Sequence, residues 1–95
     1  MAGNAAQAQV HADREVVEKV APVYPDLAKR MHLAGVVKLE VVVRANGNVK
    51  STRIVAGNPV LIQSATDAVR KWKFEAASEE TTGIVELMFD PTNSH

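Results

Sequence analysis

Cysteine is absent from these 95 residues, which excludes disulfides, thiolate metal sites and a cysteine nucleophile. The chain also has no excess of either charge, because 11 Lys and Arg balance 11 Asp and Glu. Without a positive field, non-specific binding to nucleic acid is not expected. Long apolar runs are missing too: the longest, such as residues 41–43, are of strand length, far below the ~20 residues of a membrane-spanning helix.

The remaining composition is that of an ordinary globular protein. Hydrophobic residues make up 46% and charged residues 23%, which is enough apolar material for a packed core. The length suits one domain and leaves no room for a large cleft between two. The sequence predicts a flexible lead-in at residues 1–13, a domain at 14–91 and a flexible tail at 92–95. Within the lead-in, Ala6-Gln7-Ala8 has the form of a trimmed signal-peptidase site, and a linker is the alternative interpretation.

The first half of the domain contains an extended segment, a helix and a hairpin. Residues 14–20 are expected to be extended, and a helix is predicted over 26–33, with Pro25 in its first turn and Gly35 as its left-handed stop. Residues 36–44 then alternate apolar and polar, as a half-buried strand does. Asn46-Gly47 is a strong hairpin signal, and residues 49–55 form the returning strand. The predicted core face of the first strand consists of Val37, Leu39, Val41 and Val43.

The second half contains a longer helix and a last strand. Asn58 is the predicted N-cap and Pro59 the first helical residue. Residues 84–89 are strand-like and Pro91 ends them. These elements predict an α+β domain with two helices and at least three antiparallel strands. The amphipathic stripe of the helix consists of Leu61, Ala65, Ala68, Val69 and Trp72.

Catalytic and metal-binding motifs are not found in the sequence. The three histidines, His11, His32 and His95, are scattered, without the spacing of metal ligands. The only adjacent carboxylate pair, Glu79-Glu80, is expected to keep a polar loop solvated. The basic residues around Trp72 could indicate nucleic-acid binding, but a core tryptophan at the end of a helix is the favoured interpretation. The sequence therefore predicts no enzyme, cofactor or metal.

The last strand is the remaining candidate site. At a sheet edge it would present unpaired N–H and C=O groups, to which an extended peptide can add as another strand. The alternative is that the chain protects this edge itself. Glu86 or Pro91 would blunt it, or the N-terminal segment would cover it.

The order of motifs resembles the C-terminal domain of the TonB energy transducers, over about residues 14–91. The Tyr-Pro step and the Trp-Lys-Phe step are the most specific parts, because their spacing to the glycine and Asn-Gly positions also fits. In chain order the shared motifs are PVYP at 22–25, GVV at 35–37, NGNV at 46–49, AVRKWKF at 68–74 and a strand closing at Phe89.

This resemblance implies two helices packed on one face of a three-stranded antiparallel sheet. It implies a periplasmic protein that contacts outer-membrane receptors for siderophores, cobalamin and similar nutrients, by pairing its last strand with the receptor's TonB box. A membrane anchor would lie in an N-terminal helix that these residues do not contain. The alternative is an unanchored structural or self-associating module, such as a homodimer, without a transport role. The implied partner-binding residues are Ile84, Val85, Glu86, Leu87, Met88 and Phe89.

Overall fold

The computed structural model describes residues 6–12 and 14–90. Pro91, the predicted tail at 92–95 and part of the predicted lead-in at 1–13 lie outside the described residues. The elements in chain order are β1 (Ala6–His11), β2 (Val16–Glu18), α1 (Asp26–Arg30), β3 (Gly35–Val43), β4 (Val49–Ala56), α2 (Pro59–Val69), β5 (Lys73–Phe74) and β6 (Thr81–Phe89).

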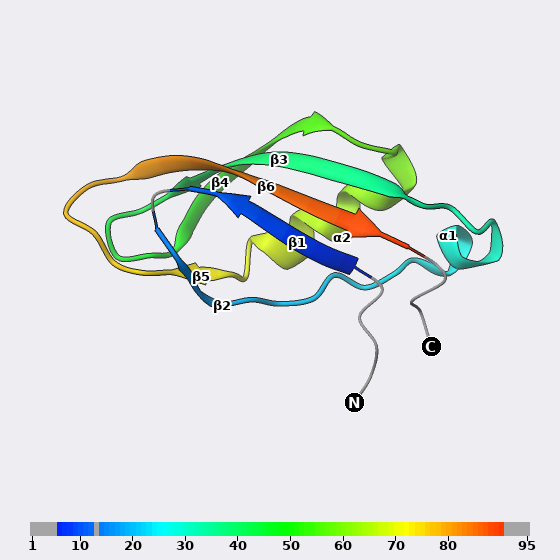
Figure 1. Ribbon diagram of the computed structural model, residues 1–95, viewed down its shortest axis with the longest axis horizontal. Helices are drawn as coiled ribbons and strands as arrows, with labels where there is room; N and C mark the ends of the chain where they lie inside the picture. The colour runs from blue at the N-terminus through cyan, green and yellow to red at the C-terminus, as the bar shows by residue number, and fades with distance from the viewer. Residues whose placement is uncertain (1–5, 13, 91–95) are drawn as a thin grey trace.

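An antiparallel sheet of four strands, in the order β1-β6-β3-β4, forms one layer of the α+β fold. The helices lie on one side of it, with α2 running across the sheet and α1 beside its end (Figure 1). Strands β2 and β5 form a separate pair. The predicted sheet of three strands is thus one strand too small, because Ala6–His11, assigned to the flexible lead-in, pairs along β6.

The hydrophobic core lies between the sheet and α2. All four predicted core residues of β3 are buried, and so are all five residues of the predicted helical stripe. Among them is Trp72, whose indole Nε1 donates a hydrogen bond to the Val20 carbonyl at 2.8 Å, so the structural interpretation of this tryptophan is confirmed. The alternation and the helical stripe correctly predict this interface because each element buries the face that carries its apolar side chains.

The predicted hairpin turn and the predicted cap of the longer helix are confirmed. Gly47 has φ 96°, and a Cβ placed there would lie 2.1 Å from the Phe74 carbonyl oxygen, so this turn requires glycine. Asn58 caps α2, with its side-chain oxygen accepting a hydrogen bond from the Val60 N–H at 2.8 Å.

Helix α1 is shorter than predicted and ends at Arg30. The His32 N–H bonds the Lys29 carbonyl and the Leu33 N–H bonds the Ala28 carbonyl, which is the pattern of a Schellman motif. His32, with φ 53°, occupies the left-handed position predicted for Gly35, which instead begins β3. The helix stops early because only Ala28 among its residues is buried, so little packing supports further turns.

Candidate functional site

The predicted partner-binding residues lie in β6, the second strand of the sheet, and they are divided between its two faces. Val85, Leu87 and Phe89 are 1%, 1% and 0% exposed and belong to the core. Ile84 and Glu86 are half-buried and Met88 is exposed, and these three alternate with the core residues, so they face away from the helices. In this structure, a molecule outside the sheet can therefore reach β6 through these three side chains.

The edge of β6 is already occupied in this structure. Strand β1 pairs with it antiparallel over six residues, from Ala6 opposite Phe89 to His11 opposite Ile84. In Figure 1 the two strands run side by side, while β3 pairs along the other side of β6. The backbone groups that would be free at a β6 edge thus have partners within the chain, as in the alternative where the N-terminal segment covers the strand.

The sequence of β1 alternates with period two, which is a signal for strand pairing. Its small and polar residues make this signal hard to notice. Ala8 and Val10 are half-buried and pack against the core cluster, whereas Gln9 and His11, which alternate with them, are exposed. Period-two alternation over six residues is typical of a half-buried strand. Alanine and glutamine are weak strand formers, so composition alone favoured a flexible segment.

Charged groups across the outer face add only weak attraction between β1 and β6. The His11 Nε2 atom and the Lys38 Nζ atom each lie 3.7 Å from the same oxygen of Glu86. All three side chains are partly exposed, and exposed polar contacts and ion pairs such as these contribute little to stability. The attachment of β1 therefore rests mainly on main-chain hydrogen bonds and on the packing of Ala8 and Val10.

Directly after β1, the chain passes close to Gly83 of β6. A Cβ placed on Gly83 would lie 2.5 Å from the Cβ of Ala12 and 3.3 Å from the His11 carbonyl oxygen. Real Cβ atoms do not approach other atoms as closely as 2.5 Å, so the close crossing depends on glycine at this position. The sequence alone gives no sign of this contact, because the two residues are far apart in the chain.

Arg14 anchors the chain directly after β1. Its side chain is 6% exposed, and its three nitrogens donate five hydrogen bonds. The acceptors come from the end of β3, the loop before β6 and the first residue of β6, so one guanidinium joins three segments. They are the carbonyls of Val43 at 3.0 Å, Arg44 at 2.7 Å, Glu75 at 2.9 Å and Glu79 at 2.9 Å, and the Thr81 hydroxyl at 3.0 Å.

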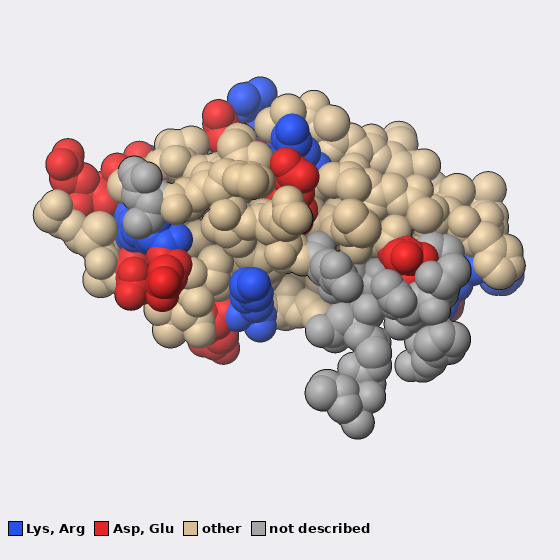
Figure 2. Space-filling view, viewed as in Figure 1, with Lys and Arg blue, Asp and Glu red and all other residues tan. Residues whose placement is uncertain are grey.

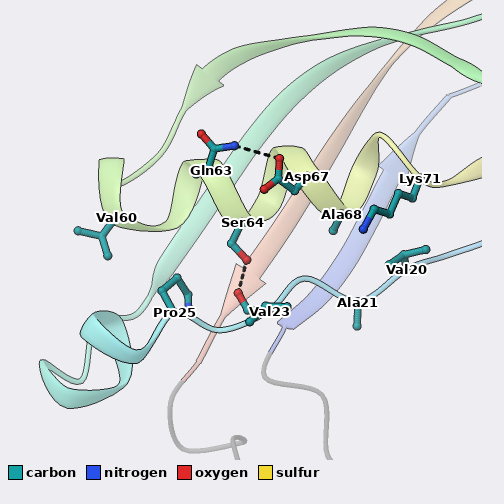
Figure 3. A pocket seen from close by; sticks show the side chains of 10 residues that line it. All are labelled: Val20, Ala21, Val23, Pro25, Val60, Gln63, Ser64, Asp67, Ala68 and Lys71. Atoms are coloured by element: carbon teal, nitrogen blue, oxygen red, sulfur yellow. Dashed lines mark hydrogen bonds between the residues drawn. The ribbon is translucent and has the colours of Figure 1, made fainter.

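A groove of 420 Å³ lies between α2 and the extended segment before α1 (Figure 3). Its lining is mostly apolar, and Gln63 and Asp67 of α2, together with Lys71 just after the helix, stand along one side. The Ser64 hydroxyl donates to the Val23 carbonyl and fastens the segment to the helix. The residues lining the groove are Val20, Ala21, Val23, Pro25, Val60, Gln63, Ser64, Asp67, Ala68 and Lys71.

The face of the sheet opposite α2 carries few charges over most of its area (Figure 2). A hollow of 200 Å³ lies on it, where β1, β6 and β3 are adjacent. Val36 and Met88 supply exposed apolar surface beside Glu86. The hollow is lined by Ala8, Gln9, Val36, Glu86 and Met88.

In residues 6–12 and 14–90, the pKa departs clearly from its ordinary value for Tyr24, Glu40 and Arg53. No group of three or more potential metal-ligating side chains is found among them. Glu80 of the predicted solvated loop is paired with Lys50 at 3.2 Å. The hydrogen bond and charge of Arg53 lower the pKa of Glu40, and burial together with Asp90 raises the pKa of Tyr24, both for structural reasons. The chemistry that the described site offers is backbone pairing.

Comparison with known proteins agrees with this architecture. The family model described as the Gram-negative bacterial TonB protein C-terminal matches residues 20–90. The solution NMR structure of the Pseudomonas aeruginosa TonB C-terminal domain has a similar fold, with a TM-score of 0.63 at 20% identity, covering 82% of this chain and 85% of that chain. No curated protein matches significantly. In the described part of this chain, no helix has the length and apolar character needed to cross a membrane.

Proposed function

Because the chain belongs to the Gram-negative TonB C-terminal family, we propose that it is a periplasmic protein-binding domain of a TonB-like energy transducer. Its partners are outer-membrane receptors that import nutrients of the siderophore or cobalamin type. The contact is strand addition, in which the TonB box of the receptor pairs with the backbone of residues 84–89. The domain itself catalyses no reaction, and pulling on a receptor requires a membrane anchor elsewhere in the transducer.

The pairing of β1 with β6 is the observation that carries this proposal. Strand β1 lies outside residues 20–90, which the family model matches, so within the family region β6 is an edge strand. An extended segment from outside that region adds to this edge in continuous register over six residues. The geometry of β6 therefore suits strand addition, for which main-chain bonds supply affinity and alternate side chains supply selectivity.

Peptide titration monitored by NMR tests the proposal. Synthetic peptides that copy TonB-box segments of outer-membrane receptors are added to the ¹⁵N-labelled chain, and the expected result is a shift of the backbone amides of residues 84–89. Peptides N-methylated at alternate residues are the matched control, because only one of the two alternating sets of amides points toward β6. One set should abolish binding and the other should leave it unchanged. Shifts confined to the groove beside α2 would contradict strand addition at β6.

Self-association is the second candidate function, and the same observation favours it. A strand that adds to β6 within one chain can add to β6 of a second copy, which gives a dimer by exchange of β1. Sedimentation at increasing concentration distinguishes the two functions. A dimer that ignores receptor peptides would support a self-associating module, whereas a monomer that binds them supports the receptor contact.

A further inference from the structure

We propose that β1 is a built-in competitor for the partner site, and that a partner segment pairs with β6 only after β1 has left it. This inference rests on the proposed function and adds regulation to it. The register shows the conflict directly, because β1 pairs with every residue from 84 to 89, the same backbone that strand addition requires. One edge of β6 cannot hydrogen-bond two strands at once, and its other edge is filled by β3.

The attachment of β1 is weak compared with that of the inner strands. Strand β3 buries four valine or leucine side chains in the core, at 0–2% exposure, whereas the described packing of β1 consists of half-buried Ala8 and Val10. The contact between His11 and Glu86 is partly exposed, and Lys38 reaches the same carboxylate without β1. Release of β1 therefore leaves the core and the charge pairing of Glu86 largely intact, which is what a displaceable strand needs.

The anchor at Arg14 keeps a released β1 close to its site. The five hydrogen bonds of Arg14 join segments other than β1, so they persist when residues 6–11 move away. The strand is thus tethered a few residues from the point where it crosses Gly83, and a tether of this length gives a high effective concentration for closing again. A partner segment must bind β6 strongly enough to displace the tethered β1. Strand β1 therefore sets the minimum affinity that a partner needs.

Two substitutions separate release of β1 from loss of the fold. Val10→Asp places a carboxylate where β1 packs against the core, which opposes docking of β1 while β6 keeps its own residues. Gly83→Ala acts from the other side, because the three atoms nearest to the added Cβ all belong to Ala12 and His11. Val17→Asp is the matched control, since Val17 is 68% exposed and lies outside the β1–β6 pair.

Hydrogen exchange on the full-length chain measures the release without any ligand. Amides along β6 alternate between bonding to β1 and bonding to β3. In Val10→Asp and Gly83→Ala, the alternate amides that face β1 should lose protection by at least about tenfold, and those that face β3 should keep theirs. Equal loss in both sets indicates general unfolding, and unchanged protection indicates that β1 remains docked. Either result would overturn the inference.

Affinity for the receptor peptides used above provides the second measurement. A competitor that is docked most of the time reduces the apparent affinity by the fraction of open molecules, so both variants should bind at least about tenfold more tightly than the natural chain and Val17→Asp. Equal affinity in all four proteins, with shifts at 84–89, would reject the competitor while leaving the proposed function in place. Binding that disappears in Val10→Asp would mean that the peptide adds to the outer edge of β1, which also rejects it. If none of the four proteins binds the peptides, both the competitor role of β1 and the proposed function are rejected.

A reversible lock completes the test. Gln9 and Glu86 lie directly opposite each other, and the natural chain has no cysteine to interfere. Opposite residues of antiparallel strands have Cα atoms about 4.5–5.5 Å apart, within the range that a disulfide spans. The Gln9→Cys/Glu86→Cys protein should lose peptide binding when oxidised and recover it on reduction, and binding that persists in the oxidised form would overturn the inference.

Discussion

The ring of Tyr24 meets the ring of Phe89 edge to face, with centroids 5.6 Å apart and an interplanar angle of 87°. This contact joins the Tyr-Pro segment before α1 to the last residue of β6. Both side chains are buried, and the Tyr24 hydroxyl also donates to the Leu33 carbonyl beyond α1. Two of the motifs that the sequence shares with the family thus hold the same end of the sheet together.

Phe89→Ala should be among the most destabilising single substitutions in this chain. Phe89 is fully buried, and truncating a buried phenylalanine costs roughly 3–5 kcal/mol. Urea denaturation measures the change in the free energy of unfolding. Val23→Ala is the control, because Val23 is 78% exposed and its truncation should stay within about 0.5 kcal/mol. A small effect of Phe89→Ala would mean that the end of β6 is not part of the core.

Tyr24 should make the protein less stable at alkaline pH. Burial, with a smaller effect of Asp90, raises the pKa of Tyr24 above its ordinary value of 10.0. The folded-state pKa is the higher one, so this contribution to stability is complete below pH ~10 and declines as pH rises from there through the folded-state pKa. Tyr24→Phe should weaken the alkaline decline, measured as the free energy of unfolding between neutral and strongly alkaline pH. An equal decline in both proteins would contradict a buried, neutral phenol.

Glu40 should lose its attraction to Arg53 in acid. The hydrogen bond from Arg53 Nε, at 3.0 Å, and the charge of Arg53 lower the pKa of Glu40. A lowered folded-state pKa means that this stabilisation is present above about pH 4.3, the unfolded value, and is lost as pH falls through the folded-state pKa. In NMR titrations, Arg53→Gln should move the midpoint of the Glu40 carboxyl upward. An unchanged midpoint would show that the pair does not persist in solution.

Arg14→Met should destabilise the fold far more than the same change at Arg53. Removing Arg14 leaves the acceptors of five hydrogen bonds without their donor, and a hydrogen bond with a charged group contributes about 1.5–3 kcal/mol. A loss of at least about 2 kcal/mol is expected by thermal or urea unfolding. Arg53→Met, at an exposed arginine, should change the free energy of unfolding much less than Arg14→Met does. Similar losses for the two variants would contradict the anchor role of Arg14.

His32→Gly should stabilise the chain slightly. His32 holds the left-handed position that closes α1, where a residue with a Cβ carries a cost of roughly 1–2 kcal/mol. Glycine removes that cost and loses some of the gain through its freer unfolded state, so a net increase of roughly 0.5–1 kcal/mol is expected. Destabilisation instead would indicate that the imidazole makes a contact that offsets the backbone strain.

Alternation and helical spacing were sufficient to predict the main interface of the fold. The core faces of β3 and α2, the Asn-Gly turn and the Asn58 cap all follow from local chemistry, because the side-chain types match one backbone conformation. The predicted end of α1 was wrong because it depends on tertiary packing as well as on local chemistry. Glycine is the usual left-handed residue, but where the helix ends depends on how much of it the core supports, and here a histidine takes the position.

The site itself could be predicted only in part. The strand predicted at 84–89 lies within β6, which begins three residues earlier, at Thr81. The occupation of its edge by β1 was left open, because weak strand formers pair only where an unpaired edge and a nearby core supply the energy. Arg14 gave no signal, since a buried arginine is recognised by the carbonyls that surround it and these come from distant parts of the chain. Gly83 matters only because Ala12 crosses it.

The sequence by itself determined the α+β class, the two helices, the central hairpin and the family, because these depend on local periodicity and on motif order. Tertiary structure alone decided that the sheet has a fourth strand and that β6 is not free at its edge. The physical reason is that a strand edge is satisfied by whichever extended segment lies nearest to it, and proximity is a property of the folded chain.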